Sequence, residues 1–323
     1  MNYFQSFFTK MQTRSYNLES KIDVLLIGGG VIGSVYAAQF ALAGHLVNVL
    51  AHGSRDKALA ANGIRLKDVV TQHLDTVPVT LVKNVSGKSF DIVIIAVQAK
   101  QLLSTFPVIQ SLAGEPRLLF LGNNPDGHKL IPKDLPGTVQ LGFPGIAGNI
   151  NNGLVEYVHI AQQPTTLEVS HSPANQIIHS VLEAQGFKLQ ETATIDGWLA
   201  YHAVLISSIS MALLRVDANA DRLGRDPKLL SLMCRSIEEG YGMLKAQGNQ
   251  GLPRNLAILH TPLLRPIAIH YWGSLMRSIK GELYFAGHLR HDQDEVKTLA
   301  NWVLRQNQNK KTSEHLESLL SDA

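Results

Sequence analysis

The stretch KIDVLLIGGGVIGSVYAAQFALAGHLVNVLA, residues 21–51, decides the fold expected for this chain. Residues 24–27 form an apolar run without polar alternation, which is typical of a parallel strand buried on both faces. A helix is predicted for residues 34–43 and a second strand for residues 46–51. A strand, a glycine turn, a helix and a strand within about thirty residues predict a nucleotide-binding unit.

Three glycines in this stretch carry the chemical signal. Gly28, Gly30 and Gly33 fall at the G-x-G-x-x-G spacing. The first glycine permits a tight turn, the second lets the backbone approach a pyrophosphate, and the third lets the helix pack on the strand. Val31 and Ile32 lie between the last two glycines, and we expect them to line the same dinucleotide site.

Two other interpretations of the stretch are weaker. Residues 24–44 carry no charged side chain, so hydropathy alone is compatible with a membrane span, but their five glycines argue against one. Glycines that serve only core packing are the second alternative, and the strand that follows the helix makes it less favoured.

The composition fits a globular protein of about two domains. The chain has 323 residues, of which 45% are hydrophobic and 17% charged, and its net charge of +3 is too small to indicate a nucleic-acid partner. Cys234 is the only cysteine, which excludes an internal disulfide and a cysteine-rich metal site. We expect a cytoplasmic protein without a membrane partner or a bound metal.

Residues 1–20 precede the first predicted strand. They have no apolar stretch long enough for a secretory signal, and their aromatic and basic residues are compatible with an organelle-targeting helix. We favour an extension of the chain here, and Met11 is an alternative start.

The cofactor type should be decided by the loop predicted for residues 52–57. A carboxylate there would bind a ribose 2′-hydroxyl, whereas a cation would bind a 2′-phosphate. His52, Arg55 and Lys57 offer donors and positive charge, although Asp56 stands among them. The loop therefore predicts NADP in preference to NAD.

Two more apolar runs, residues 90–97 and 117–121, predict further parallel strands. In an open doubly wound sheet, ligands lie outside the carboxyl ends of the strands. Gln98, Lys100 and Asn123 are therefore expected to meet the cofactor or the substrate, although turn chemistry also explains the asparagine.

The strands continue to about residue 170. Residues 139–141 predict a strand, residues 142–148 a loop, and residues 153–161 and 165–169 a pair of strands that extends the sheet. The fold class is therefore α/β, with a Rossmann-type doubly wound parallel sheet in the N-terminal domain.

Helical periodicity dominates the rest of the chain, with helices predicted near residues 173–185, 196–214 and 226–246. This part is predicted to be an all-helical substrate and dimerisation domain. The predicted boundaries are an extension at 1–20, the Rossmann domain at 21–170, the helical domain at 171–308 and a polar tail at 309–323.

From about residue 21 to residue 306 the chain resembles the ketopantoate reductase family. The matching pieces are residues 28–33, 58–66 and 91–101, Asn123, and a Gly-Phe pair at 186–187 before a helix with Trp198. The resemblance implies hydride transfer from NADPH to the ketone carbon of a small 2-oxo acid. It also implies the Rossmann and helical domains, and we expect a homodimer.

Much of the family's catalytic set is missing from this sequence. Ala200 stands where the family has its general-acid lysine, and Val204 replaces an asparagine one turn later. Ala286 aligns with an expected acidic residue, Gln98 with a lysine, and His52 with an arginine at the end of the second strand. The resemblance therefore leaves catalysis open.

Other family positions are retained, and the resemblance assigns them to the site. They are Asn123, Ser208 and Ser274, the last being the family's carboxylate-binding serine. His202 is the candidate for a replacement acid because histidine titrates near neutrality. Two helical positions rotate a side chain by about 200°, so His202 lies off the lysine's face, and a buried structural histidine is the alternative.

A second group of polar residues is spaced to stack on one helix face. His288, His291 and Glu295 are compatible with a polar site lining, a metal site or a solvated face, and metal is least favoured. His288 is included among the candidate catalytic residues, and Lys100 across the crevice is a further candidate acid.

Two functions follow from these observations. The first is an NADP-dependent reductase with a changed substrate pocket. The second is a nucleotide-binding protein that has lost hydride transfer and works by sensing or by contact with a partner. The glycine loop, Asn123 and Ser274 favour the enzyme, whereas Ala200 and Val204 favour the binder.

Overall fold

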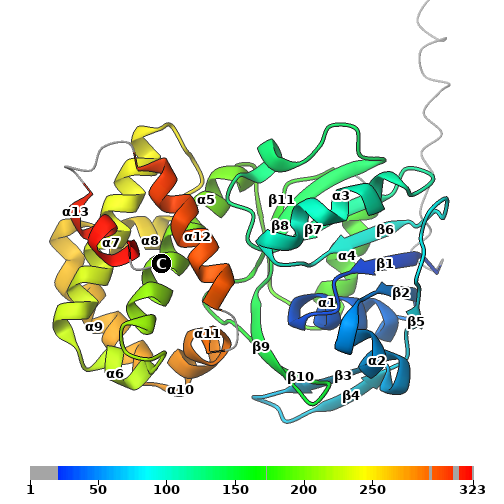
Figure 1. Cartoon of the computed structure of the whole chain (residues 1–323), viewed down its shortest axis with the longest axis horizontal. Helices are drawn as coiled ribbons and strands as arrows, with labels where there is room; N and C mark the ends of the chain where they lie inside the picture. Colours follow the sequence, from blue (N-terminus) through cyan, green and yellow to red (C-terminus); the bar gives the residue numbers. More distant parts are fainter. Residues whose placement is uncertain (1–20, 172, 291–292, 308–312, 322–323) are drawn as a thin grey trace, which may run out of the picture.

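The computed structural model describes residues 21–171, 173–290, 293–307 and 313–321, so the predictions for residues 1–20 and for His291 lie outside the described residues. A sheet-containing half and a helical half lie side by side, with β9 running along the border between them (Figure 1). This arrangement confirms the predicted α/β fold with a helical C-terminal region.

The main sheet has eight strands in the order β12-β11-β8-β7-β6-β1-β2-β5. From β8 to β5 the strands pair in parallel, whereas β11 pairs with β8 in antiparallel orientation. The strands of the chain are β1 Asp23–Ile27, β2 Leu46–Leu50, β3 Ile64–Asp68, β4 Leu74–Val77, β5 Thr80–Leu81, β6 Ile92–Ile95, β7 Arg117–Leu121, β8 Thr138–Phe143, β9 Ile146–Asn151, β10 Leu154–His159, β11 Thr165–Glu168 and β12 Leu189–Thr192.

The central strand β1 is buried on both of its faces. Val24 and Leu26 belong to the core on the α1 side, and Leu25 and Ile27 belong to the core on the α3 side. Helices therefore cover the two faces of the sheet, which is the doubly wound arrangement expected from the apolar run.

The prediction that residues 153–161 pair with residues 165–169 is wrong. β10 instead pairs with β9 and β3 in a second sheet of order β4-β3-β10-β9, and β11 joins the main sheet. The two-residue turn Asn152–Gly153, with φ of 47° and 80°, folds the predicted loop region back into the β9–β10 hairpin. β12 extends the main sheet to Thr192, beyond the boundary expected near residue 170.

The helical half is built around α5, which packs against α7 and α12. Asp226 caps α7 by accepting hydrogen bonds from the backbone N–H groups of Lys228 and Leu229. The helices are α1 Val31–Leu42, α2 Gly53–Asn62, α3 Leu102–Gln110, α4 Pro173–Ala184, α5 Ile195–Leu214, α6 Ala220–Gly224, α7 Pro227–Ala246, α8 Arg254–Leu259, α9 Arg265–Met276, α10 Ile279–Gly281, α11 Gly287–Leu289, α12 Gln293–Gln306 and α13 Glu314–Leu320, with short turns η1 Ala99–Gln101, η2 Gly127–Leu130, η3 Pro262–Leu264 and the π-helical turn η4 Glu282–Ala286.

The predicted polar tail is also corrected by the structure. Helix α13 lies within it and packs on α7, with Leu316, Leu319 and Leu320 fully buried in the helical core. Apolar side chains at this helical spacing form a core-facing stripe.

One helix among the described residues, α5, is long and apolar enough to cross a membrane. Of its most apolar window, 89% is buried inside the protein.

Candidate active site

The glycine loop between β1 and α1 has three distinct local geometries. Gly28 has a φ of 106°, and a Cβ atom there would lie 2.4 Å from the carbonyl oxygen of Ala96. A Cβ atom on Gly33 would lie 2.1 Å from the carbonyl oxygen of Gly28, whereas one on Gly30 would have no neighbour within 4 Å. The first and third glycines are thus required by packing, and the second leaves open space before the N-terminus of α1, where phosphate groups bind favourably.

A cavity of about 630 Å³, here called the glycine-loop cavity, lies beside this loop. The end of β2, the start of α2, η1 with α3, and the β9–β10 hairpin form the rest of its wall. Its polar side chains are His52, Arg55, Gln98, Gln101, Ser104 and Thr105.

The residues expected to read the 2′-position lie in a helix and not in a loop. Helix α2 begins at Gly53, with His52 as its exposed N-cap residue, because a run of good helix formers follows. Asp56 forms an ion pair with Lys83, so this carboxylate is already bound within the protein. His52 is left at the cavity wall after β2.

The Arg55 side chain is hydrogen-bonded to other groups of the protein. Its Nε donates to the carbonyl oxygen of Gly29 at 2.6 Å, and its two terminal nitrogens donate to Ser34 Oγ at 2.8 Å and to the carbonyl oxygen of Gly153 at 3.1 Å. Burial lowers the pKa of this guanidinium. The expected contact between Arg55 and a 2′-phosphate would require these hydrogen bonds to break.

A second cavity, of about 290 Å³ and here called the central cavity, lies between the sheet and the helical half. Gly30, Ala96, Val97 and Gln98 border both cavities, so the two adjoin. The described residues that line the central cavity include no lysine or arginine. Its lining is mostly apolar and contains Val31 and Ile32, and its polar side chains are Gln98, Asn123, Gln163, His202, Ser210, Tyr284 and Glu295.

His202 lies in the wall of this cavity as a buried, neutral ring. It stacks on Trp198 with ring centroids 5.1 Å apart, and it contacts Phe143 at 4.0 Å. Burial lowers the pKa of His202 to about 3, and its Nε2 has no hydrogen-bond partner. The ring is therefore uncharged at neutral pH, and it cannot be the protonated donor that the sequence analysis considered.

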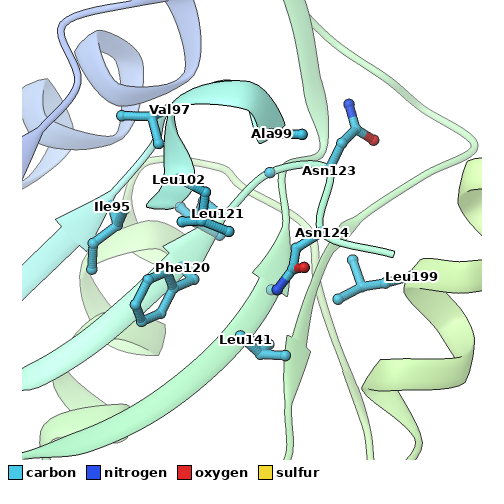
Figure 2. Close-up of a pocket in the computed structure, with 12 residues that line it drawn as sticks. Ile95, Val97, Ala99, Leu102, Phe120, Leu121, Asn123, Asn124, Leu141 and Leu199 are labelled. Atoms are coloured by element: carbon cyan, nitrogen blue, oxygen red, sulfur yellow. The ribbon is translucent and has the colours of Figure 1, made fainter. Parts of the chain in front are cut away.

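Asn123 contacts a carboxylate, that of Glu295, which is distant in the sequence. Its Nδ2 donates to Glu295 Oε1 at 2.8 Å, and both side chains line the central cavity. Figure 2 shows the neighbouring Asn124 pointing elsewhere, toward Leu141 and Leu199. Sequence spacing grouped Glu295 with two histidines, and only the tertiary fold reveals its contact with Asn123.

The two serines expected in the site lie elsewhere. Ser208 is fully buried and hydrogen-bonded to Ser236 Oγ at 2.9 Å between α5 and α7, and Ser274 is exposed on α9, outside the lining of the central cavity. Ser210, two positions beyond Ser208 in α5, lines the cavity instead. The side chain of His288 lies outside the described residues.

Packing closes the positions at which the sequence resemblance indicated missing catalytic residues. Ala200 and Val204 are buried in the helical core, and Ala286 is fully buried as well. Lys100, the other candidate acid, pairs with Asp294 at 3.3 Å and does not line the central cavity.

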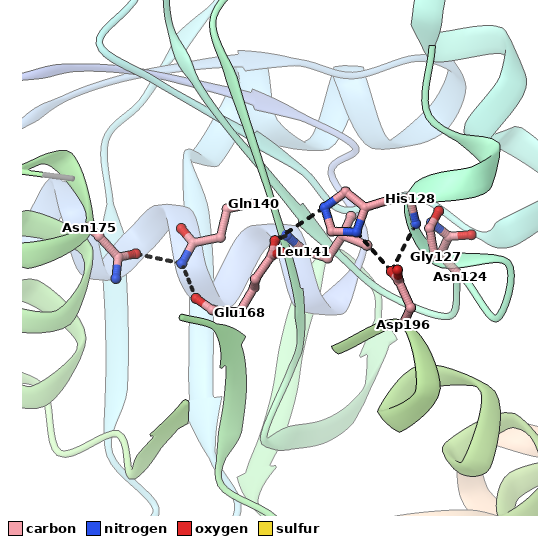
Figure 3. A network of polar contacts seen from close by, with 8 residues as sticks. All are labelled: Asn124, Gly127, His128, Gln140, Leu141, Glu168, Asn175 and Asp196. Atoms are coloured by element: carbon pink, nitrogen blue, oxygen red, sulfur yellow. Dashed lines mark hydrogen bonds and ion pairs between the residues drawn. The ribbon is translucent and has the colours of Figure 1, made fainter. Parts of the chain in front are cut away.

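The loop after β7 is fastened to the helical half. Figure 3 shows His128 between two carboxylates: its Nδ1 lies 2.8 Å from Asp196 of α5, and its Nε2 lies 3.3 Å from Glu168 of β11. The same loop accepts a hydrogen bond from Trp302 Nε1 of α12 at Asp126 Oδ1. These contacts hold Asn123 against α12.

No group of three or more metal-binding side chains occurs among the described residues. The geometry is instead that of a nucleotide loop whose cavity leads to a mostly apolar chamber. Such chambers with a few polar groups are typical of small-molecule sites.

Comparisons with known proteins agree with this fold. Residues 24–172 match the family model described as Ketopantoate reductase PanE/ApbA. No curated protein matches the chain.

Several solved structures resemble the whole chain. A PanE/ApbA family ketopantoate reductase from Ralstonia eutropha JMP134 is 21% identical with a TM-score of 0.72, and the match covers 92% of this chain and 97% of that one. A probable 2-dehydropantoate 2-reductase from Bacillus subtilis is 17% identical with a TM-score of 0.67, covering 93% and 98%. A D-mandelate dehydrogenase with NADH and anilino(oxo)acetate is 14% identical with a TM-score of 0.71, covering 93% and 97%. At these low identities, the structural likeness shows a shared fold.

The glycine geometry gives the first prediction. Gly30→Val should fold normally, because its Cβ has open space, but it should abolish nucleotide binding by filling that space. Gly33→Val is the matched variant, and it should be strongly destabilised by collision with the Gly28 carbonyl. Thermal unfolding with a fluorescence titration of NADPH compares the two. A Gly30→Val protein that binds nucleotide like the parent would show that the loop serves packing alone.

Proposed function

We propose that this chain is an oxidoreductase of the ketopantoate reductase PanE/ApbA family, whose model residues 24–172 match, and that it transfers hydride from NADPH to the ketone carbon of a 2-oxo acid. The adjoining cavities are the observation that carries the proposal. They share Gly30, Ala96, Val97 and Gln98, so one extended dinucleotide can have its pyrophosphate at the glycine loop and its nicotinamide near Asn123.

The residues of the chain have separate roles in this proposal. Reduced nicotinamide supplies the hydride. The backbone of the glycine loop and the N-terminus of α1 bind the pyrophosphate, and Asn123 donates to the substrate carbonyl oxygen. Glu295 lies beside Asn123 and serves as the general acid that gives the developing alkoxide its proton, and its partly exposed side lets a proton return from solvent.

The lining of the central cavity limits the range of possible substrates. A carboxylate there meets no lysine or arginine among the described lining residues, so the groups that can bind it are the neutral donors Gln98, Gln163, Ser210 and Tyr284. Most of the wall is apolar, which favours a 2-oxo acid with a large apolar side chain over ketopantoate. The homodimer and the cytoplasmic location remain predictions.

The alternative function, nucleotide binding without hydride transfer, has one supporting observation. The family's lysine position is closed by Ala200 in the helical core, and the nearby His202 is uncharged at neutral pH. A protein of this kind would bind NADPH and would not consume it.

Turnover separates these two functions. We expect NADPH oxidation, followed at its near-ultraviolet absorbance, to be faster with phenylglyoxylate than with ketopantoate, because the aromatic ring fits the apolar wall. The Gly30→Val protein is the control for any change in absorbance that does not depend on bound nucleotide. Tight NADPH binding with no oxidation by any 2-oxo acid of the panel would support the alternative.

Glu295 is tested by substitution with an amide. Glu295→Gln keeps a group that can contact Asn123 but has no acidic proton, so turnover should fall about a hundredfold to ten-thousandfold while NADPH affinity is retained. Asp294→Asn is the matched control, because this neighbouring carboxylate lies outside the cavity lining. Because the pKa of His202 is near 3, its titration should not change the turnover rate between pH 6 and 8. A turnover rate that is unchanged in Glu295→Gln would show that another group donates the proton.

The proposed preference for NADP rests on two residues, since Arg55 is already hydrogen-bonded to the main chain. His52 stands at the cavity wall, and Asp56 is paired with Lys83 and does not compete for a ribose hydroxyl. His52→Asp should reverse it, because a carboxylate repels a 2′-phosphate and accepts a 2′-hydroxyl, with an expected loss of NADPH affinity of about tenfold or more. His270→Asp makes the same change on an exposed part of α9. Parent protein that binds NADH and NADPH equally would refute the preference.

A further inference from the structure

Arg55 joins three segments that are distant in the sequence. It stands in the first turn of α2, and its hydrogen bonds reach the glycine loop at Gly29, the first turn of α1 at Ser34, and the hairpin tip at Gly153. Ser34 Oγ in turn donates to the Gly29 carbonyl at 3.2 Å, which closes a small network around that oxygen. The Arg55 stem also packs on the loop, since a Cβ on Gly29 would lie 3.1 Å from Arg55 Cγ.

The acceptors around this guanidinium are all uncharged. Each of its three nitrogens donates to a carbonyl or hydroxyl oxygen, and no carboxylate pairs with Arg55 among the described residues. Its positive charge therefore remains uncompensated next to the glycine-loop cavity, where it attracts any phosphate. A pyrophosphate is common to NADH and NADPH, so this attraction does not distinguish the two.

We propose that Arg55 is a positioning residue that holds the glycine loop in its binding conformation and strengthens the binding of both nucleotides equally. The proposal rests on the proposed nucleotide site. By fixing the Gly29 carbonyl, Arg55 fixes the peptide plane that carries the Gly30 N–H, at the glycine whose Cβ position is open. A role as the specific ligand of a 2′-phosphate would require the side chain to leave all three of its partners.

The hairpin contact extends this effect to the substrate side. The tip at Gly153 belongs to the hairpin whose first strand, β9, contributes Ile146, Ala147 and Gly148 to the central cavity. Arg55 thus holds the glycine loop and one wall of the central cavity in a fixed relation.

The experiment compares Arg55→Met, which is similar in length and neutral, with Arg55→Lys, which keeps the charge and loses the planar fork. Lys88→Met is the matched control, because it removes an exposed cation of the sheet-containing half that lies outside the lining of the glycine-loop cavity. Hydrogen exchange of the nucleotide-free proteins reports on residues 28–34 and 150–154, and fluorescence titration gives the affinities for NADH and NADPH. Circular dichroism verifies folding. Ser34→Ala serves as a milder variant, because it removes one acceptor of Arg55 and one donor to the Gly29 carbonyl.

In Arg55→Met we expect exchange in both segments to accelerate roughly tenfold and both nucleotides to bind about ten to a hundred times more weakly, with the NADPH-to-NADH affinity ratio unchanged. Arg55→Lys should recover part of the affinity and little of the protection, and Lys88→Met should match the parent. A loss confined to NADPH, with unchanged exchange, would overturn the proposal and make Arg55 a 2′-phosphate ligand. Parent protein that binds neither nucleotide would refute the proposed function, and the exchange rates alone would then decide whether Arg55 holds the loop.

Discussion

The rest of the structure depends on the close approach of α1 to the end of β1. Gly33 lies so near the carbonyl oxygen of Gly28 that no side chain fits between them. This contact sets where α1 begins, and the orphan N–H groups of its first turn therefore face the cavity beside the loop. The turn before it is equally constrained, because Gly28 passes directly against the carbonyl oxygen of Ala96 at the end of β6. Two strands and one helix are thus fixed at the point where ligands of this fold bind.

The core of the fold could be predicted from sequence because its signals are local. The apolar runs of β1 and β7 and the capping residue Asp226 each act within a few residues. The predictions were wrong where a segment pairs with residues distant in the sequence. Residues 154–159 have the composition of a strand in any sheet, and only their pairing with β3 reveals that they belong to a second one.

The site was harder to predict for the same reason. Asn123 and Glu295 are 172 positions apart, and Arg55 and Gly153 are 98 apart, so no spacing rule connects them. The charge of Arg55 led to the prediction of a contact with a 2′-phosphate, but the sequence could not show that its donors are used within the protein. Burial likewise decides the state of His202, and helical spacing gave only its direction.

The loop after β7 bears on how this protein would choose its ligands. Asn123, Asp126 and His128 attach it to α12 and α5, so a hinge motion between the two halves would have to break several polar contacts together. The loop therefore acts as a spacer beside the central cavity. If the cavity holds a ligand as proposed, this spacer would select that ligand by its width. Selection of this kind is coarse, and it depends on shape more than on charge.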